Sequence, residues 1–393
     1  MTNQMKNVPE LRFPEFDGEW EEGTIKSLVH GNLSDGDWIN KEYLLPNGKY
    51  RIIQTGNISV GKYLNKEKSS KFISQSSYDE LKANEVFPGD ILISRLADPA
   101  GRSIIMPNIN WKMVTSVDVA IIRPNKKFES YFLISILNTD KKLYDISKLV
   151  SGTSHKRISR KNLEKVKIIY PKIQEQQKIG DFFSKLDRQI ELEEQKLEKL
   201  EEQKKGYMQK IFSQELRFKD ENGNDYPEWE IKKLMQIAKV KTGSKNVQDN
   251  IQDGKFKFFD RSVEVKYLNT FDFDETAIIY PGEGSKFLPR YFSGKYSLHQ
   301  RAYSIYDINI NNNYLYYYLS LQNNHFLKYA VGSTVKSLRM SGFDKLKVMV
   351  PKNSEQEKIG DFFNELDELI EKQSNKIDLL KERKKGFLQK MFV

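Results

Sequence analysis

The stretch PKIQEQQKIGDFFSKLDRQIELEEQKLEKLEEQKKGYMQKIFS, residues 171–213, decides the fold because it occurs twice. Residues 351–393 read PKNSEQEKIGDFFNELDELIEKQSNKIDLLKERKKGFLQKMFV, and the two copies are identical at 23 of 43 positions without a gap. A repeat of this length does not arise by chance. It divides the chain of 393 residues into two blocks, each followed by its own copy of the repeat.

Apolar residues within each copy recur in steps of four and three, which is the pattern of a coiled-coil helix. A proline opens each copy, and the first turn of a helix tolerates proline. A helix of about 40 residues spans roughly 60 Å. The predicted seam consists of Ile179, Phe183, Leu186, Ile190, Leu197, Leu200, Tyr207 and Ile211 in the first copy, and of Ile359, Phe363, Leu366, Ile370, Ile377, Leu380, Phe387 and Met391 in the second.

Polar residues interrupt both seams at the same two places. Glu193 and Gln373 take one core position, and Lys204 and Lys384 take the other. Polar core residues of this kind fix the register of a coiled coil. Because a narrow apolar stripe needs a partner, the shared interruptions favour an intramolecular, antiparallel pair of the two copies. The alternative is two independent surface helices, each packed on its own block.

The composition indicates a cytoplasmic protein of several domains. Cysteine is absent, which fits a reducing compartment and excludes a disulfide scaffold or a thiolate metal site. No apolar run reaches membrane-spanning length, and the N-terminus lacks the apolar core of a signal peptide. We expect a first globular domain over residues 1–170, a helix over 171–213, a second domain over 214–350 and a second helix over 351–393.

The net charge of +10 lies in the two blocks. Each helical copy carries nine basic and nine acidic residues, whereas residues 1–170 carry 26 basic against 20 acidic, and residues 214–350 carry 20 against 16. A basic surface suits a polyanion, and neutral helices suit contacts with proteins. An ordinary basic protein is the alternative.

The two blocks open alike. Leu11-Arg12-Phe13, Trp20 and the segment 25–28 of the first block correspond to Leu216-Arg217-Phe218, Trp229 and the segment 231–234 of the second. Their middles differ in length and sequence. Both middles carry short β-rich runs bounded by turns, which predicts an α/β (α+β) fold with short strands. The predicted strands cover residues 50–53, 90–94 and 117–123 in the first block, and residues 255–259, 277–280 and 302–306 in the second.

A further matched piece precedes each helix. Residues 152–159 read GTSHKRIS and residues 332–339 read GSTVKSLR. A glycine turn with hydroxyls and cations can contact a phosphate through backbone N–H groups and positive charge. A turn that only starts the following strand explains the pattern equally well.

These motifs resemble the specificity subunit of type I restriction–modification systems. The resemblance extends over the whole chain, and its most specific part is the repeated helix with EQQKIGDFF and EQEKIGDFF. It implies two target recognition domains, each reading one half of a split site in double-stranded DNA. It also implies that the two spacer helices form an antiparallel coiled coil with a pseudo-twofold relation between the repeats.

The resemblance further implies partners that carry the chemistry. Two methyltransferase (modification) subunits dock on the helices and bind S-adenosylmethionine, and restriction/translocase subunits use ATP and Mg²⁺. This chain then holds no cofactor and selects the site.

The residues agree that the chain carries no recognisable catalytic motif. The N/D-P-P-Y/F/W motif of amino-methyltransferases is absent, and residues 98–101 and 282–286 lack the aromatic residue or the spacing of a cofactor loop. The four histidines, His30, His155, His299 and His325, are scattered, so no metal site is predicted. The alternatives are a stand-alone DNA-modifying enzyme and a coiled-coil scaffold protein whose basic charge is incidental.

Candidate DNA-binding residues are Arg, Lys and Gln side chains at predicted strand ends and turns, where they can reach base edges. The aromatic run YLYYY over residues 314–318 could stack on bases, but its helical context favours core packing. The candidates are Arg51, Gln54, Arg95, Arg102, Lys156 and Arg157 in the first block, and Arg261, Lys286, Arg290, Gln300, Arg301, Lys336 and Arg339 in the second.

Overall fold

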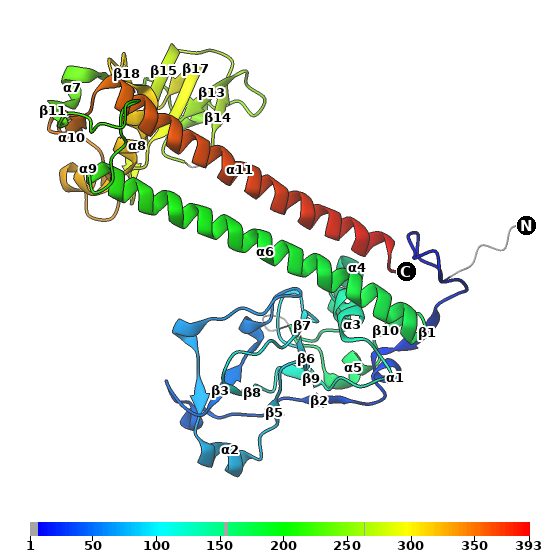
Figure 1. Ribbon diagram of the computed structural model, residues 1–393. Helices are drawn as coiled ribbons and strands as arrows, with labels where there is room; N and C mark the ends of the chain where they lie inside the picture. Colours follow the sequence, from blue (N-terminus) through cyan, green and yellow to red (C-terminus); the bar gives the residue numbers. More distant parts are fainter. Residues whose placement is uncertain (1–6, 153–155, 263) are drawn as a thin grey trace, which may run out of the picture. The chain divides into compact units, whose positions relative to one another are not determined.

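The computed structural model describes residues 7–152, 156–262 and 264–393. Two long helices, α6 (Ile173–Phe212) and α11 (Asn353–Lys390), are its longest elements (Figure 1). The chain forms two compact units: Met1–Glu194 with Lys376–Val393, and Gln195–Asn375. Each long helix therefore contributes one part to each unit.

In the first unit, the start of α6 packs against the end of α11. The ring centroids of Phe182 and Phe387 lie 5.0 Å apart. Lys376 donates a hydrogen bond of 2.8 Å to Glu193, and Lys384 forms an ion pair with Asp187. Later residues of α6 thus contact earlier residues of α11, so the two helices run antiparallel.

The second unit repeats this packing with the other two helix parts. The rings of Phe212 and Phe363 stack at 5.9 Å, and Lys204 forms an ion pair with Asp367. The predicted antiparallel pair is confirmed, and the predicted polar interruptions at Lys204 and Lys384 are paired across the two helices. Nine of the sixteen seam residues are buried, namely Ile179, Phe183, Ile190, Ile211, Ile359, Phe363, Ile377, Leu380 and Met391. Six are half-buried, namely Leu186, Leu197, Leu200, Leu366, Ile370 and Phe387, and Tyr207 is 38% exposed.

Both long helices begin with a buried anchor that holds a block. In the first unit, the Glu175 carboxylate accepts hydrogen bonds of 2.8 Å from both Nε and Nη2 of Arg12 and one of 3.3 Å from the indole of Trp20. Gln176 accepts the backbone N–H of Glu129 at 3.2 Å, at the residue that caps helix α3 (Ser130–Leu137). The opening segment of the block and a helix from its other end are thereby held on α6.

The second unit contains the same anchor. Glu355 accepts hydrogen bonds from Arg217 at 3.1 and 2.7 Å and from the indole of Trp229 at 3.0 Å. Gln356 accepts the backbone N–H of Asn311, the cap of α8 (Asn312–Ser320), at 2.9 Å. The repeated Glu-Gln pair therefore holds each block on its helix.

The glycine of the same repeat allows this close approach. A Cβ atom at Gly180 would lie 1.9 Å from the Glu129 carboxylate, and one at Gly360 would lie 2.9 Å from the side-chain oxygen of Asn311. Real Cβ atoms do not come so near, so a larger residue would push the cap away from the long helix.

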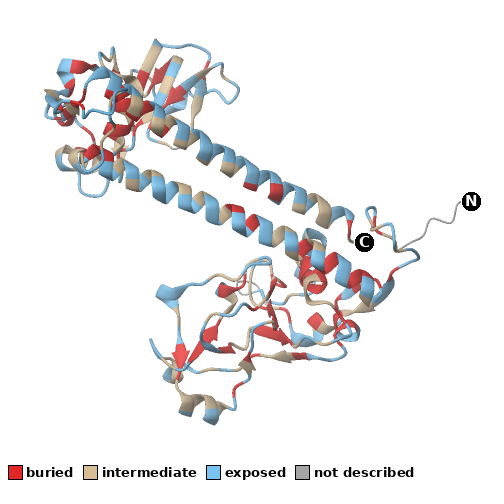
Figure 2. Ribbon diagram, in the orientation of Figure 1, coloured by how far each residue is buried: buried red, intermediate tan, exposed pale blue. Residues whose placement is uncertain are grey.

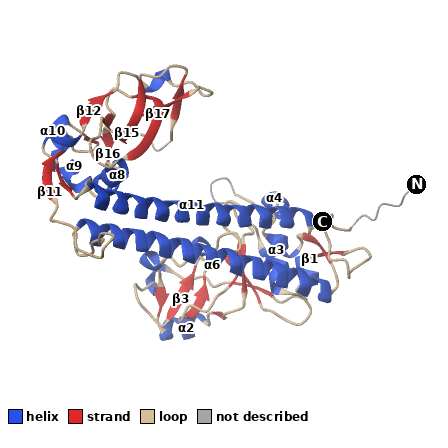
Figure 3. Cartoon of the chain, turned by 45° about the horizontal axis from the view of Figure 1, so that its top comes forward, coloured by secondary structure: helices blue, strands red, loops and turns tan. Residues whose placement is uncertain are grey.

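Two four-stranded sheets form the first block (Figure 3). Their orders are β2-β9-β6-β7 and β4-β3-β8-β5, and β3 runs parallel to β8. The three predicted strands are confirmed as β3, β6 and β9. The strands are β2 (Leu33–Asp35), β3 (Tyr50–Ile53), β4 (Phe72–Ile73), β5 (Glu85–Val86), β6 (Ile91–Ser94), β7 (Ser103–Ile105), β8 (Lys112–Thr115) and β9 (Val119–Ile122).

The second block has one six-stranded sheet in the order β12-β18-β15-β17-β13-β14. The predicted strands are confirmed as β13, the end of β15, and β18. The strands are β12 (Lys239–Thr242), β13 (Phe256–Phe259), β14 (Lys266–Leu268), β15 (Phe273–Tyr280), β17 (Arg290–Leu298) and β18 (Tyr303–Tyr306), and β16 (Glu283–Gly284) pairs separately with β19 (Lys336–Ser337).

A proline explains why one block has two sheets and the other has one. In the second block, the uninterrupted strand β17 pairs with both β15 and β13. In the first block, Pro107 and Asn110 separate β7 from β8. Proline cannot donate a ladder hydrogen bond, and Asn110 has φ of +57°, so the chain leaves the sheet between these strands.

A two-stranded sheet closes each block, β1 (Glu21–Thr24) with β10 (Lys167–Tyr170) and β11 (Glu230–Lys233) with β20 (Lys347–Val350). The expected match of segment 25–28 with segment 231–234 is wrong by three residues. Ile25 donates its N–H to the carbonyl of Val166, and the equivalent bond comes from Leu234 to Leu346. Ile231 lies in the edge strand and is 66% exposed, because only the residues after this strand turn into the core.

Short helices complete both blocks, and their apolar faces fill the cores (Figure 2). Tyr314, Tyr317 and Tyr318 on α8 are buried, so the prediction of core packing for the aromatic run is confirmed. The remaining helices are α1 (Ile25–Leu28), α2 (Gln75–Leu81), α4 (Asp140–Ser147), α5 (Arg160–Glu164), α7 (Leu234–Ile237), α9 (Asn323–Tyr329) and α10 (Met340–Asp344), with 3₁₀ turns at Lys41–Tyr43, Thr55–Asn57, Glu67–Ser69 and Val247–Asp249.

Candidate DNA interface

Three arginines and two aspartates gather in the first block, and we name them the first arginine cluster: Arg95, Arg157, Arg160, Asp35 and Asp118. The Arg95 Nη1 lies 3.0 Å from Asp35, and the Arg157 Nε lies 2.8 Å from Asp118. Arg160 lies 3.7 Å from the second oxygen of Asp35. Arg157 and Arg160 keep 41% and 48% of their side-chain surface exposed. Arg157 and Arg160 thus each hold a carboxylate on one side and can still offer N–H donors to a phosphate or a base edge.

Arg95 differs from the expectation that it reaches outward, because it is only 4% exposed. It directly follows strand β6 and donates to the carbonyl of Val117. Burial lowers the pKa of Arg95, and the charge of Asp35 opposes this change. Arg95 is therefore the buried arginine of the cluster, while Arg157 and Arg160 face solvent.

The turn before α5 is attached to this cluster. Ser151 and Arg157 exchange backbone hydrogen bonds of 2.9 Å each, and Ile158 donates its N–H to the carbonyl of Arg95 at 2.9 Å. Gly152, at the start of the turn, has φ of +100°, a value that favours glycine. The expected hydroxyl and histidine contacts of residues 153–155 lie outside the described residues. Lys156 is exposed and lies 3.5 Å from Asp98.

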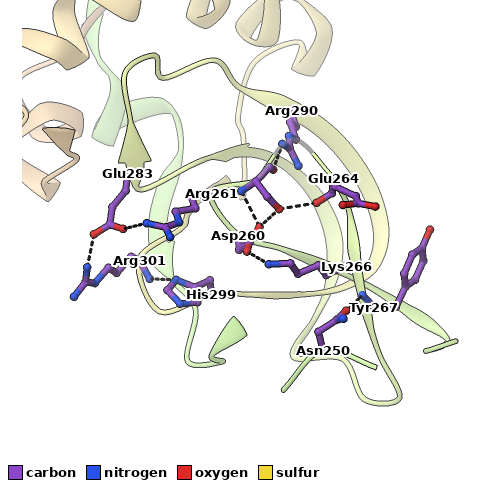
Figure 4. A network of polar contacts seen from close by, with 11 residues as sticks. Asn250, Asp260, Arg261, Glu264, Lys266, Tyr267, Glu283, Arg290, His299 and Arg301 are labelled. Carbon is purple, nitrogen blue, oxygen red and sulfur yellow. Dashed lines mark hydrogen bonds and ion pairs between the residues drawn. The ribbon is translucent and has the colours of Figure 1, made fainter. Parts of the chain in front are cut away.

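The second block has its own cluster, shown in Figure 4. The second arginine cluster consists of Arg261 and Arg301 with Glu283 between them. Arg261 lies 3.3 Å from one oxygen of Glu283, and Arg301 forms an ion pair with the other. The two arginines are 65% and 63% exposed and the carboxylate only 14%. Glu283 therefore orients two exposed guanidinium groups from a half-buried position.

A buried aspartate supports the loop that carries Arg261. Asp260 is 4% exposed, pairs with Lys266, and accepts the backbone N–H of Ser262 at 2.8 Å. Burial alone would raise the pKa of Asp260, but these hydrogen bonds lower it overall. His299 accepts the backbone N–H of Arg301 at 3.2 Å, and burial lowers its pKa. The loop is thus fixed by its own polar contacts.

The two clusters occupy matched places within their blocks. In the second block, Leu338 donates its N–H to the carbonyl of Gly282 at 2.8 Å, as Ile158 does to Arg95 in the first. Val331 and Ser337 exchange backbone hydrogen bonds as Ser151 and Arg157 do. Ile158 therefore lies beside the segment that follows β6, and Leu338 lies beside the segment that follows β15. Both β6 and β15 are inner strands of their sheets.

The other candidate residues form no ion pair with these clusters. Arg51 and Gln54 lie together in a separate hollow, and Arg51 is buried because it stands inside β3. Arg290 donates to the carbonyl of Ser262 and is half-buried. Gln300 lines the same hollow as the second arginine cluster and donates a hydrogen bond of 2.8 Å to Asn246. The remaining candidates, which form no ion pair with a described residue, are Arg102, Lys286, Lys336 and Arg339.

Sequence reasoning missed the acidic partners of the clusters and Arg160. Asp35 and Arg95 are far apart in the chain, and only the pairing of β2, β9 and β6 brings them together. A lone aspartate in a sequence looks like a solvated charge. Within the described residues, no group of three or more His, Cys, Asp or Glu side chains is placed to hold a metal ion. None of the described helices is long and apolar enough to cross a membrane.

Comparison with known proteins assigns the chain to a family. The family model described as the type I restriction modification DNA specificity domain matches residues 17–202 and 226–382. The chain belongs to this family. Each match includes one block and most of the long helix that follows it, so the chain contains two specificity-domain repeats.

Individual relatives within the specificity-domain family are distant. The EcoDI specificity subunit of Escherichia coli is 27% identical over 162 residues, which cover 41% of this chain and 36% of that protein. The MjaIX specificity subunit of Methanocaldococcus jannaschii is 27% identical over 263 residues, 64% of this chain and 58% of that protein. The aligned part spans between about a third and three fifths of the length of these relatives.

Two solved structures share the specificity-domain fold. The S subunit of the type I restriction-modification system of M. genitalium has a TM-score of 0.64 at 17% identity, with 98% of this chain and 99% of that chain covered. A second structure, from work on complex assembly and conformational transition of the type I R-M system, has a TM-score of 0.53 at 15% identity and covers 95% and 97%. The two recognition blocks and the paired long helices are therefore the architecture of solved specificity subunits.

Proposed function

We propose that the chain is the DNA-recognition subunit of a type I restriction–modification complex and that it binds a bipartite, asymmetric site. Each block is the target recognition domain for one half-site, with boundaries near residues 1–170 and 214–350. The helices over residues 171–213 and 351–393 are the spacer. The chain selects the site and leaves the reaction to its partners.

The observation that carries the proposal is the pair of arginine clusters at matched places in two blocks of different sheet architecture. A shared position suits a shared task, which is contact with DNA. Different loops and different residues suit two different half-sites. Both clusters expose guanidinium groups oriented by carboxylates, the arrangement that bidentate contacts to phosphate or guanine require.

The long helices are proposed as the docking surface for two methyltransferase subunits, to which restriction/translocase subunits add. Their equal numbers of acidic and basic residues suit protein contacts better than DNA contacts. Leu192, Leu369 and Leu379 are 41%, 50% and 57% exposed on these helices. In this proposal S-adenosylmethionine, ATP and Mg²⁺ belong to the partner subunits, and the complex works in the cytoplasm.

The decisive experiment is purification of the complex from the native host, with mass spectrometry of its partners and sequencing of methylated genomic DNA. The expected result is a methyltransferase partner and a split, asymmetric methylated site that disappears when this chain is deleted. Methylation by the isolated chain would indicate a stand-alone modifying enzyme. A complex that does not bind DNA would indicate a scaffold.

The proposed spacer has its own test. The test inserts four residues into each long helix, after Gln203 in α6 and after Glu368 in α11. These two positions face each other in the antiparallel pair, so both helices become longer by roughly 6 Å. At about 3.4 Å per base pair, the unspecified gap of the methylated site should grow by about two base pairs while both half-sites stay the same. An unchanged gap in an active complex would assign the spacing to the partner subunits.

A further inference from the structure

Arg51 is a buried cation without a hydrogen-bond or ion-pair partner for its side chain in the part of the chain that the structure describes. It lies in β3 between β4 and β8, and only 3% of its surface is exposed. Its Nη2 atom has no hydrogen-bond partner among the described residues, and no described carboxylate lies within ion-pair distance. Buried guanidinium groups are normally paired, because loss of hydration is costly.

Other buried cations of the same block follow this rule. Arg95 is paired with Asp35, and Lys142 donates a hydrogen bond of 2.7 Å to the carbonyl of Lys167. Burial raises the pKa of Tyr63, and the positive charge of Arg51 partly opposes this rise. The Tyr63 hydroxyl also lacks a hydrogen-bond partner among the described residues. Among the residues that the structure describes, Arg51 is therefore unpaired, whereas Arg95 and Lys142 of the same block are paired.

Arg51 is one of the residues that line a hollow of about 350 Å³ at the end of β3. Lys66 and Lys71 line the hollow with Arg51, and three hydroxyl side chains, those of Thr55, Ser69 and Ser70, line it too. The described residues that line it include no carboxylate. Glu67, which follows Lys66 in the chain, instead accepts a hydrogen bond of 3.0 Å from Asn65. The Ser69 and Ser70 hydroxyls already donate to the carbonyl of Lys66 at 3.4 and 3.1 Å, so the donor set that suits a phosphate is the three cations without an acid.

We propose that this hollow is an anion site that takes one phosphate of the DNA backbone beside the half-site of the first block. The inference rests on the proposed function and adds a site apart from the first arginine cluster. Reading of a base edge does not fit, because a side chain must project into the major groove, and Arg51 is recessed in a strand. A phosphate projects from the duplex, so it can enter a recess.

The first test replaces the two rim lysines, which are exposed and outside the core. Lys66→Ala with Lys71→Ala should weaken DNA binding by the purified complex roughly tenfold. The slope of log affinity against log salt should become shallower by about one. Both changes should be the same on cognate and unrelated duplexes, because a phosphate carries no sequence. The matched control, Lys68→Ala with Lys126→Ala, removes two exposed lysines of the same block that do not line the hollow.

The outcomes separate this site from the proposed function. An unchanged affinity and slope in a complex that binds DNA would overturn the phosphate site alone. A changed methylation sequence with an unchanged slope would overturn it in favour of base reading. An equal loss in the control pair would also overturn it, since the effect would then be general charge. Absence of DNA binding by the unaltered complex would overturn both proposals.

A second variant tests the buried cation itself. Arg51→Met keeps much of the side-chain volume and removes the unpaired charge, so the melting temperature of the free protein should stay the same or rise. DNA affinity should still fall as in the rim variant. A fall in melting temperature together with unchanged DNA affinity would show that Arg51 serves the fold, and would overturn the proposal.

Discussion

Replacement of the buried anchor of α11, Glu355→Gln, should selectively destabilise the second unit. The Glu355 side chain is fully buried and accepts two hydrogen bonds from Arg217 and one from Trp229. The amide would turn a donor toward the guanidinium and leave its charge uncompensated. Loss of one member of a buried ion pair costs about 3–5 kcal/mol.

The same helix supplies a matched control. Glu368 is 68% exposed and lies 3.3 Å from Lys372 one turn later. Glu368→Gln removes the same charge from α11, but an exposed pair contributes only about 0.3–0.5 kcal/mol. The difference between the two variants therefore measures the effect of burial.

Calorimetry and hydrogen exchange provide the assay. The melting temperature of a domain of 150–250 residues falls by about 2–4 °C per kcal/mol of lost stability. Glu355→Gln should therefore lower the melting temperature of the second unit by roughly 6–20 °C. Amides of residues 214–350 should exchange faster, and those of the first block should not. Glu175→Gln should produce the reverse pattern. A melting temperature for Glu355→Gln within about 2 °C of the Glu368→Gln control would refute the anchor.

Three further predictions concern recognition. Lys156→Ala with Arg157→Ala should weaken binding to any duplex and make the salt dependence shallower by about one or two, because phosphate contacts release counterions; a titration with an unchanged slope would contradict this. Glu283→Gln should leave the second arginine cluster unoriented and lower discrimination against mismatched half-sites by roughly 1–3 kcal/mol, measured as the ratio of cognate to mismatched affinity; an equal loss on all duplexes would instead indicate an effect on folding. Exchange of residues 30–150 for those of another specificity subunit should change one half-site of the methylated sequence, and an alteration of both halves would contradict the modular arrangement.

The repeat made the large features of the fold predictable. A heptad pattern identifies a long helix from local spacing, and the shared polar interruptions at Lys204 and Lys384 indicated the antiparallel partner before any contact was known. Short strands with turns at their ends were equally visible. These features depend on residues close together in the chain.

The site was predicted less completely, because it depends on contacts between distant residues. Arg51 and Arg95 looked like projecting donors at strand ends, but strand pairing buries both. The role of Glu283 between Arg261 and Arg301 follows from the close approach of Gly282 to the backbone of Arg301, which no local pattern reveals. The EQ-x-KIGDFF segment was noticed as a family signature, and its physical task, attachment of the blocks, required the structure.

The composition of the first unit has a consequence for synthesis on the ribosome. Phe392 packs in its core at 5.8 Å from Phe183 and 6.4 Å from Trp20, so this core needs residues that are translated after the whole of the second unit. The 181 residues of the second unit lie between the two parts of the first, and at roughly 5–20 residues per second their translation takes about 9–36 s. During this time the apolar core residues of the first block that pack on the end of α11 stay exposed. The second unit is one continuous segment, so it can already fold. Chaperone binding to nascent chains should concentrate on residues 1–194 during this interval.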